Sequence, residues 1–222
     1  AQEQNGWLYQ AGGLDMCNKV YNELGLQFLP CGNTGNQMGG WYNKEINTAA
    51  DLDGLKFRMP GLGGEILKTF GVNVILLPGT EVLAALTSGA IDGTEWIGPV
   101  ADRGKGLYKV AKYYYYPGWH QPATLFSLMI NRDRWDELTP ARRASIESVC
   151  GDNIRYGLAE GEALQFAALK ALQLKGVQMH RWPDTILEAM KRSWLDVAEE
   201  EAAADEDFKQ VWASMSEFRR DY

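Results

Sequence analysis

Apolar and basic residues alternate over Leu55–Arg58 and predict a short strand. Leu55 and Phe57 are apolar, and a basic residue follows each of them, which is the period of two that a half-buried strand shows. Pro60 cannot continue a strand ladder, and a cluster of glycines comes directly after it. We therefore expect a strand, a sharp turn and a helix that begins near Glu65.

Short apolar runs and helix signals alternate along the rest of the chain. The apolar runs predict strands at residues 26–29, 72–77, 113–116, 125–130 and 177–182, and the strand at 125–130 is expected to be buried. Helices are predicted at residues 14–24, 48–52, 65–70 and 80–88, the last capped by Thr80, and from residue 184 onward. This alternation at short spacing predicts an α/β fold, in which helices connect the strands of a sheet.

One predicted helix is much longer than the others. Thr139 and Pro140 form a strong start signal, since threonine caps a helix and proline fits its first position. Apolar residues then recur over residues 146–172, and the run stops at Gly176. An unbroken helix of this length spans roughly 50 Å at about 1.5 Å per residue. That exceeds the width of a small domain, so we expect it to cross two lobes, with glycines such as Gly157 allowing a bend or close packing.

The composition limits the classes of function. The chain has 222 residues, of which 45% are hydrophobic and 23% charged, as in soluble globular proteins of one large or two modest domains. A net charge of -7 argues against non-specific binding to nucleic acid. An anionic ligand therefore requires a local cationic site, which adds weight to Arg58. No run of apolar residues is long enough to predict a transmembrane helix.

The three cysteines do not define a disulfide framework or a metal site. Cys17, Cys31 and Cys150 lack the spacing of either. A bridge between Cys17 and Cys31 is compatible with an oxidising compartment, but the sequence leaves it open. The opening residues do not form a signal peptide, so we expect the chain to be mature, trimmed or a fragment.

Arg58 is the first candidate for a functional residue. It ends the predicted strand at the edge where open α/β sheets hold their ligands, and a guanidinium matches a carboxylate through two parallel hydrogen bonds. The following glycines, Gly61, Gly63 and Gly64, are expected to bring backbone N–H groups to a helix start that favours an anion. The alternative is an ordinary surface arginine and glycines that only turn the chain.

Glu95 and Trp96 form the second candidate. They lie between glycines at the end of an apolar segment, where Glu95 is suited to hold a cation or a hydroxyl group and Trp96 to form a pocket wall. The alternative places Trp96 in the core. Residues 32–41, rich in glycine and amides, suit either a polar ligand or a linker. His120 follows a tryptophan, and a lone histidine in that setting is more typical of structure than of catalysis; no catalytic or nucleotide-binding motif is present at informative spacing.

On these segments the chain resembles the periplasmic solute-binding proteins of TRAP transporters, in the branch that binds 2-oxo and 2-hydroxy monocarboxylates. The resemblance rests on Gly32–Trp41, Leu55–Gly61 and Ala90–Pro99, and continues through Gly106–Trp119. It implies a two-lobed periplasmic binding protein of type II-like α/β fold, whose lobes close on the ligand while one long helix crosses both.

The resemblance also implies how the chain is divided. The first lobe would comprise residues 1–32 and 118–136, the second lobe residues 33–117 and 177–182, the lobe-spanning helix residues 137–176, and the C-terminal helices residues 183–222. Such proteins begin with roughly a further third of chain that builds much of the first lobe. We therefore expect an N-terminally truncated chain with an incomplete first lobe.

The roles of individual residues follow from the same resemblance. Arg58 would clamp the ligand carboxylate, while Gln37, Glu95, the backbone carbonyl of Trp96 and Gln121 would surround a metal ion that also touches the ligand. An all-oxygen set with one carboxylate suits a hard cation, sodium or calcium. This branch often has a glutamate where this chain has Gln121. The neutral amide makes the set of cation ligands less negative by one charge. The alternative is that Glu95 pairs with Arg58 or Arg103 and binds no ion.

The resemblance implies a receptor that delivers its solute to the membrane subunits of a TRAP transporter and catalyses nothing. The rival hypothesis is a metal-assisted lyase or isomerase acting on a small oxo acid, with Glu95 as the base; the lack of a second acid–base group near Glu95 in the sequence counts against it. Trp194, Phe208 and Trp212 are too apolar for a free tail. We expect them to pack on the body of the protein or on a second subunit, and we predict a homodimer.

Overall fold

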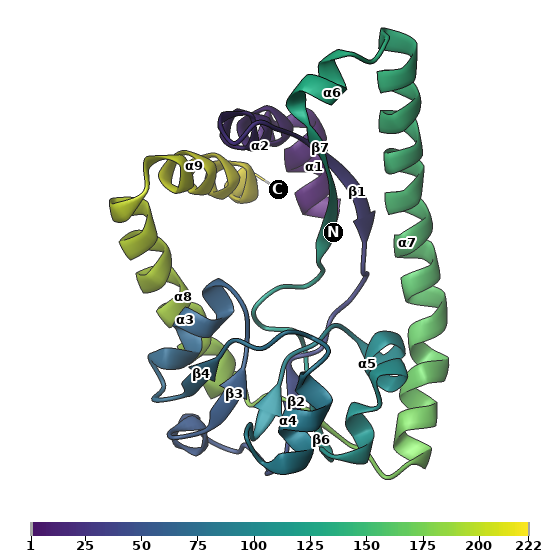
Figure 1. Cartoon of the computed structure of the whole chain (residues 1–222). Coiled ribbons are helices and arrows are strands. Elements are labelled where there is room, and N and C mark those ends of the chain that lie inside the picture. The colour runs from purple at the N-terminus through teal and green to yellow at the C-terminus, as the bar shows by residue number, and fades with distance from the viewer. Residues whose placement is uncertain (1, 222) are drawn as a thin grey trace. The chain divides into compact units, whose positions relative to one another are not determined.

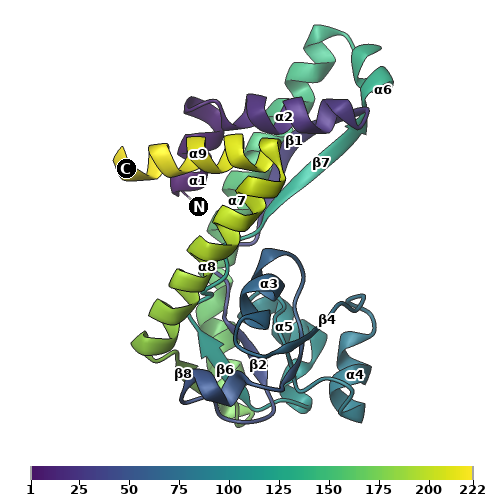
Figure 2. The ribbon, with the colours of Figure 1, turned by 90° about the vertical axis from the view of Figure 1, so that its left-hand side faces the viewer.

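The computed structural model describes residues 2–221, which divide into two compact units (Figures 1 and 2). Unit 1 comprises Ala1–Gly35, Thr124–Glu160 and Ala198–Tyr222, and unit 2 comprises Asn36–Ala123 and Gly161–Val197. The predicted α/β class is confirmed. The lobes proposed from the sequence remain a proposal; their bounds differ from these units at residues 33–35, which lie in unit 1, and at residues 118–123, which lie in unit 2.

Unit 1 combines helices with a two-stranded antiparallel sheet. Its elements are α1 (Gln2–Gln10), α2 (Gly13–Glu23), β1 (Leu26–Asn33), β7 (Leu125–Asn131), α6 (Arg132–Asp136), the first part of α7 (Pro140–Leu174), the end of α8 (Asp184–Ala204) and α9 (Glu206–Asp221). Strands β1 and β7 pair from Leu26 opposite Asn131 to Asn33 opposite Leu125, with an irregularity between Pro30 and Gly32. The prediction of a buried strand at 125–130 is wrong. Because β7 pairs with β1 alone, most of its side chains stay exposed, Phe126 at 53%.

A disulfide joins β1 to α7 within unit 1. It links Cys31 to Cys150, which are 119 residues apart in the sequence, while Cys17 is a free thiol. The bridge considered between Cys17 and Cys31 is therefore wrong. Cys31 and Cys150 pack with Leu29 and Trp135 in a small apolar cluster, so the covalent link reinforces a modest core.

Helix α9 packs against α1 and α2 in the same unit (Figure 2). The indole N–H of Trp7 donates to the hydroxyl of Ser214 over 3.1 Å, and Lys19 lies 3.3 Å from the carboxylate of Asp207. Helix α1 was not predicted, because its sequence has little helical periodicity. The C-terminal helical stretch is confirmed, and α9 packs on the body of the protein: a Cβ on Gly6 of α1 would lie 3.0 Å from the ring of Phe218.

Unit 2 holds a six-stranded mixed sheet of order β4-β3-β5-β2-β6-β8. Its elements are β2 (Gly40–Tyr42), η1 (Ala49–Leu52), β3 (Lys56–Arg58), α3 (Leu62–Lys68), β4 (Asn73–Ile75), α4 (Val82–Ser88), β5 (Gly93–Thr94), α5 (Pro99–Lys105), η2 (Leu107–Lys109), β6 (Tyr113–Tyr116), β8 (Gln178–Arg181) and parts of α7 and α8. Strand β3 runs parallel to β4 and β5, β2 runs antiparallel to β5 and β6, and β6 runs parallel to β8.

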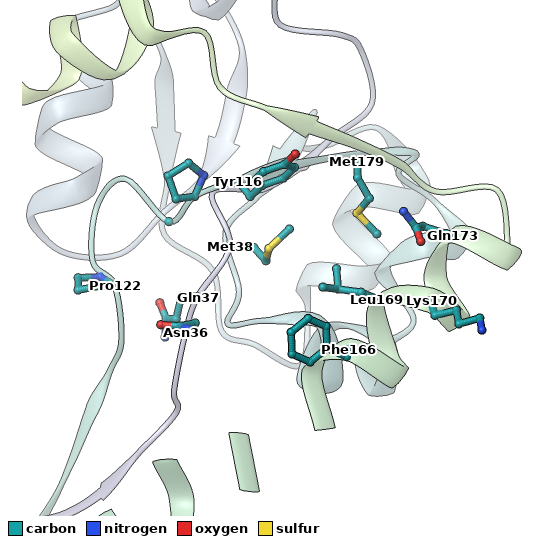
Figure 3. A pocket seen from close by; sticks show the side chains of 12 residues that line it. Asn36, Gln37, Met38, Tyr116, Pro122, Phe166, Leu169, Lys170, Gln173 and Met179 are labelled. Atoms are coloured by element: carbon teal, nitrogen blue, oxygen red, sulfur yellow. The ribbon is translucent and has the colours of Figure 1, made fainter. Parts of the chain in front are cut away.

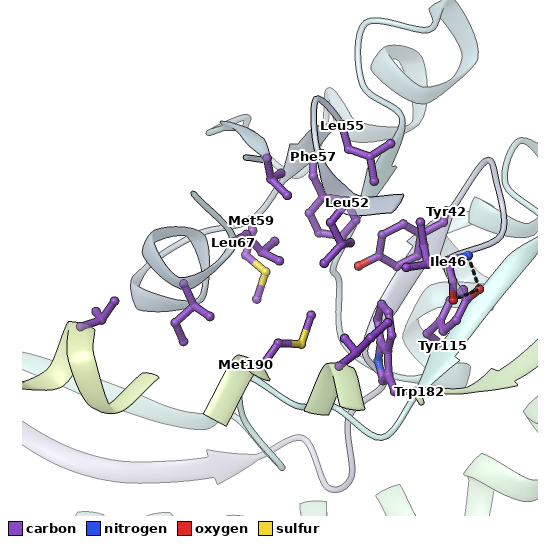
Figure 4. Packing of buried hydrophobic residues seen from close by; sticks show 14 residues of the cluster. Tyr42, Ile46, Leu52, Leu55, Phe57, Met59, Leu67, Tyr115, Trp182 and Met190 are labelled. Atoms are coloured by element: carbon purple, nitrogen blue, oxygen red, sulfur yellow. Dashed lines mark hydrogen bonds between the residues drawn. The ribbon is translucent and has the colours of Figure 1, made fainter. Parts of the chain in front are cut away.

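Two apolar clusters hold the sheet of unit 2. One contains Phe57 and Trp182 (Figure 4), and the other contains Trp41 and Tyr114. In the first cluster the hydroxyl of Tyr115 accepts the backbone N–H of Ile46 over 2.6 Å. Burying apolar surface stabilises the sheet by roughly 25 cal/mol per Å² removed from water. The strand ends that carry the candidate residues therefore belong to a well-packed part of the protein.

The long helix starts and ends as the sequence predicts. The hydroxyl of Thr139 accepts the N–H of Arg142 over 3.4 Å, and α7 runs from Pro140 for 35 residues. Gly157 is needed for close packing, because a Cβ there would lie 2.7 Å from the carbonyl oxygen of Asn33. The expected cap of α4 is wrong: Glu81 occupies that position and its side chain makes no capping hydrogen bond. Among the described residues, no helix is long and apolar enough to cross a membrane.

Candidate functional site

Arg58 is the last residue of β3, as its strand period predicts. Its side chain is 11% exposed, so the guanidinium is largely removed from water. Its Nε–H donates to the carbonyl of Leu77 over 3.3 Å, and Nη1 donates to the backbone carbonyl of Glu95 over 3.2 Å. Within the described residues Nη2 makes no hydrogen bond. Burial lowers the pKa of Arg58 and the Glu95 carboxylate opposes this, but an arginine stays charged.

Glu95 directly follows β5 and is buried beside Arg58. Its backbone N–H donates to the carbonyl of Arg58 over 3.2 Å, which fixes the two residues side by side. One carboxylate oxygen, Oε2, lies 3.8 Å from Nη1 of Arg58, a long ion pair. The other, Oε1, is buried and makes no hydrogen bond within the described residues. The pairing with an arginine that the sequence left open is therefore present, and it occupies one of the two oxygens.

His120 is the residue that the sequence reasoning missed. Its side chain is 6% exposed, and Nε2 lies 3.4 Å from Oε1 of Glu95. Neither ring nitrogen makes a hydrogen bond within the described residues. A buried polar group without a partner is costly, and such groups are typical of sites that receive a ligand. Its rarity, as one of two histidines in the chain, was the only signal available in the sequence.

Trp96 forms one wall beside the arginine. The Arg58 guanidinium carbon lies 5.4 Å from the centroid of the indole ring, and the Lys105 ammonium lies 4.7 Å from it. Cations at these distances are attracted to the face of the ring. Gly79 lets the ring approach the backbone, because a Cβ there would lie 2.4 Å from the indole. Trp96 is half-buried and packs against the apolar cluster of Trp41 and Tyr114, so its role as a pocket wall stays a prediction.

Gln37 and Gln121 are brought together as a second pair. The amide nitrogen of Gln121 donates to the side-chain oxygen of Gln37 over 2.9 Å, and Gln37 is 5% exposed. The backbone N–H of Gln37 donates to Pro122, and that of Met38 donates to Ile97, each over 3.0 Å. The segment at 36–38 therefore lies between the segments that carry Gln121 and Glu95. The structure places all five predicted residues on neighbouring segments of unit 2, with Arg58, Glu95 and Trp96 in one group and the two glutamines in another.

Asp102 of α5 supports the segment that carries Glu95 and Trp96. It is 1% exposed and accepts three hydrogen bonds: from the Trp41 indole N–H over 2.8 Å, from the Tyr114 hydroxyl over 2.7 Å and from the Ile97 backbone N–H over 3.1 Å. Burial raises the pKa of Asp102 to about 7, although these hydrogen bonds oppose the rise. The carboxylate thus anchors the chain directly after Trp96.

The shifted pKa of Asp102 predicts a pH dependence of stability. Because the pKa rises on folding from 3.8 to about 7, the folded chain binds the proton more tightly than the unfolded chain between these values. The resulting stability is complete below about pH 4 and is lost as the pH rises through about 7. Urea unfolding of the parent and Asp102→Asn at pH 5 and pH 8 measures it, since other groups cancel in the difference. We expect the parent to lose stability relative to the variant at pH 8; an equal difference at both values would contradict the assignment.

The glycines after β3 lie in close contact with neighbouring side chains. Gly61 has a φ of 63° and begins the turn into α3. A Cβ on Gly63 would lie 2.3 Å from the Met59 side chain, and one on Gly64 would lie 3.0 Å from Val74. These close approaches give both glycines a role in packing; the anion cradle predicted at this turn stays a prediction.

A cavity of about 770 Å³ also lies in unit 2 (Figure 3). Of the five predicted residues, only Gln37 lines it. Its other lining residues are Asn36, Met38, Tyr116, Pro117, Gly118, Pro122, Phe166, Leu169, Lys170, Gln173 and Met179. The buried charges and the unpaired polar atoms lie instead at Arg58, Glu95 and His120, and we place the candidate site there.

The predicted oxygen donors fit a hard cation. Oε1 of Glu95 is a buried carboxylate oxygen without a hydrogen bond, and the amide oxygens of Gln37 and Gln121 and the carbonyl of Trp96 are neutral donors of the kind that sodium and calcium accept. Among the described residues, no three His, Cys, Asp or Glu side chains are grouped so as to hold a metal ion. The set therefore suits a weakly charged, oxygen-only site and not a zinc site.

The chain is similar to known proteins over nearly its whole length. The chain is 40% identical over 220 residues to the monocarboxylate 2-oxoacid-binding periplasmic protein of Nostoc sp., covering 99% of this chain and 60% of that protein. It superposes with a TM-score of 0.96 and 35% identity on a TRAP transporter solute-binding protein of Bordetella bronchiseptica, described as a mixed-occupancy dimer with calcium and picolinate, covering 99% of this chain and 66% of that one. The TM-score is 0.94, at 34% identity, for a relative from Pseudoalteromonas atlantica with sodium and pyruvate, covering 100% of this chain and 68% of the relative.

The chain thus spans less than two thirds of the length of the first two relatives. Residues 1–205 match the family of bacterial extracellular solute-binding proteins, family 7, also called DctP. The match covers nearly all of the described chain, and the resemblance predicted from Gly32–Trp41, Leu55–Gly61 and Ala90–Pro99 is confirmed. The chain therefore belongs to bacterial extracellular solute-binding protein family 7.

Proposed function

We propose that this chain is the solute-binding part of a periplasmic receptor for a small 2-oxo or 2-hydroxy monocarboxylate, which it delivers to a TRAP-type secondary transporter. The observation that carries the proposal is the buried guanidinium of Arg58, which lies 3.8 Å from Glu95 and retains an Nη2 group without a hydrogen bond within the described residues. The names of the relatives, which refer to 2-oxoacids and pyruvate, support the same class of solute.

Arg58 supplies the recognition of the solute carboxylate. A carboxylate that accepts from Nη2 meets a fully charged group in a largely dry environment, where a charge-assisted hydrogen bond is about twice as strong as a neutral one. Trp96 covers one face of the guanidinium at 5.4 Å and restricts its orientation. The guanidinium is therefore held in position in the protein without solute, which reduces the conformational entropy lost on binding.

A cation bound near Glu95 would reduce the repulsion between Glu95 and the solute carboxylate. We propose that Gln37, Glu95, the carbonyl of Trp96 and Gln121 hold this ion, which is sodium or calcium in the relatives from Pseudoalteromonas atlantica and Bordetella bronchiseptica. The ion supplies positive charge at a place where two anions would otherwise meet in a site of low dielectric constant. With a single carboxylate among its donors, the site favours a loosely held or monovalent ion.

Cation and solute are expected to bind with positive coupling, each raising the affinity for the other by the same factor. After chelation, pyruvate is titrated calorimetrically in potassium, sodium and calcium buffers. Affinity should be higher with sodium or calcium than with potassium, and Glu95→Gln should remove that dependence. Equal affinities in all three buffers, with no change in Glu95→Gln, would leave the cation without a role.

A metal-assisted lyase or isomerase is the second candidate, because His120 lies beside Glu95 and adds the second acid–base group that the sequence lacked. Calorimetry of pyruvate and lactate, with proton NMR of the same samples over hours, separates the two functions. A receptor shows one-to-one binding and unchanged solute. Product formation, or exchange of the solute's C–H hydrogens with solvent at a catalytic rate, would contradict the proposal of a receptor.

The remaining proposals concern partners. Family membership supports a membrane transporter as the recipient of the solute. A homodimer is suggested by the relative described as a dimer, whereas within this chain α9 packs against α1 and α2. Pairing through the C-terminal helices therefore requires α9 to exchange between two copies, or requires a different face; light scattering of the purified protein measures the mass directly.

A further inference from the structure

We propose that His120 is a solute-contacting residue, whose Nε2–H donates to the oxygen on carbon 2 of the bound acid. This inference rests on the proposed function, because it takes the solute to be a 2-oxo or 2-hydroxy monocarboxylate. It adds a residue that neither the sequence motifs nor the predicted cation site includes. It also gives that residue a task distinct from those of Arg58 and Glu95.

The burial of His120 requires a partner that the chain itself does not supply. The side chain is 94% removed from water, as its exposure is 6%, and neither nitrogen makes a hydrogen bond within the described residues. Leaving a buried donor unpaired costs roughly 1–3 kcal/mol. Packing holds the ring in place: Trp119 meets it edge-on with ring centroids 5.6 Å apart, and a Cβ on Gly63 would lie 3.4 Å from the Cβ of His120.

The neighbouring carboxylate leaves the donor of His120 available. Nε2 lies 3.4 Å from Oε1 of Glu95, but the angles between the two groups do not suit a hydrogen bond. Within the described residues neither atom makes one. A third atom can therefore lie within reach of both. Oε2 of Glu95 lies near Arg58 and Oε1 lies near His120. In the proposed pose, an acid whose carboxylate accepts from Arg58 would lie along Glu95 with its second carbon toward His120.

The chemistry of the two unpaired atoms selects the group that fits them. Oε1 of Glu95 only accepts hydrogen bonds or binds a cation, while an imidazole N–H requires an acceptor. A cation alone satisfies Glu95 but repels the N–H of His120. A carbonyl or hydroxyl oxygen on carbon 2 accepts from Nε2, and a hydroxyl can in addition donate to Oε1. A site that hydrogen-bonds such a group discriminates against an acid that lacks it.

Three acids of equal chain length test the role of His120. Lactate carries a hydroxyl on carbon 2, pyruvate carries an oxo group there, and propionate carries neither. Calorimetric affinities are measured for the parent, for His120→Leu, and for His120→Gln, which keeps an N–H donor on a chain of similar reach. His180→Leu is the matched control, because His180 lies in the same unit, stacked on Tyr115 at 5.2 Å.

The parent should bind lactate and pyruvate more tightly than propionate. His120→Leu should weaken lactate and pyruvate roughly tenfold or more and leave propionate unchanged, His120→Gln should recover most of the loss, and His180→Leu should match the parent. An equal loss for all three acids would show a structural role, and no loss would show no role; either overturns the inference while the receptor function stands. If the parent binds none of the three acids, the proposed function itself fails and this inference fails with it.

Discussion

Replacing Arg58 by alanine is expected to weaken monocarboxylate binding by roughly 2–5 kcal/mol, because the solute then leaves its carboxylate buried without a charged partner. Arg58→Lys should also bind weakly, since a single ammonium group cannot donate to the carbonyls of Leu77 and Glu95 and to the solute carboxylate in the planar arrangement that a guanidinium provides. Calorimetry with pyruvate measures both variants. An Arg58→Ala protein within twofold of the parent would rule out the clamp.

Two controls separate binding from folding in this experiment. Arg58 donates to the carbonyls of Leu77 and Glu95, so its loss also removes two structural hydrogen bonds. Circular dichroism and thermal unfolding of each variant show whether unit 2 is intact at the temperature of the titration. Arg103→Ala is the matched charge control, because Arg103 is exposed on α5; it should bind pyruvate as the parent does.

Removing the disulfide between Cys31 and Cys150 is expected to lower the free energy of unfolding by about 2–5 kcal/mol. The bond closes a loop with a sequence separation of 119, and a cross-link of this length restricts the unfolded chain strongly. It also lies in the small cluster of Leu29 and Trp135, so serine at these positions also places a polar group among apolar side chains. Denaturant unfolding of Cys31→Ser/Cys150→Ser against the parent measures the loss.

The free cysteine provides the control for this prediction. Cys17→Ser should unfold like the parent, because Cys17 takes no part in the bond. Adding a reductant should bring the parent to the level of the double variant and leave that variant unchanged. A double variant as stable as the parent, or a reductant effect that persists without the two cysteines, would contradict the structural role of this disulfide.

Local features of the fold were predictable because their causes lie within a few residues. The alternation at Leu55–Arg58 places Arg58 at the end of β3, and Thr139 with Pro140 starts α7 where the capping rule predicts it. The two groups of candidate residues, which the family resemblance brought together, lie on neighbouring segments of unit 2. Their roles as solute and cation ligands stay predictions.

The features that were missed depend on contacts between distant residues. The partner of Cys31 lies on α7, far along the chain, and no spacing rule relates the two positions. The exposure of β7 follows from its single pairing with β1, which its apolar sequence does not indicate. His120 is of interest because Glu95, on a distant segment of the sequence, lies beside it; in the sequence, a lone histidine next to a tryptophan pointed to a structural role.

A crystal structure of the protein with pyruvate, and one with lactate, tests the central claim most directly. We predict density for the acid with its carboxylate on Nη2 of Arg58, its second carbon toward His120, and Glu95 alongside. A solute that lies instead in the cavity lined by Phe166 and Met179, with Arg58 bonded only to Leu77 and Glu95, would contradict it.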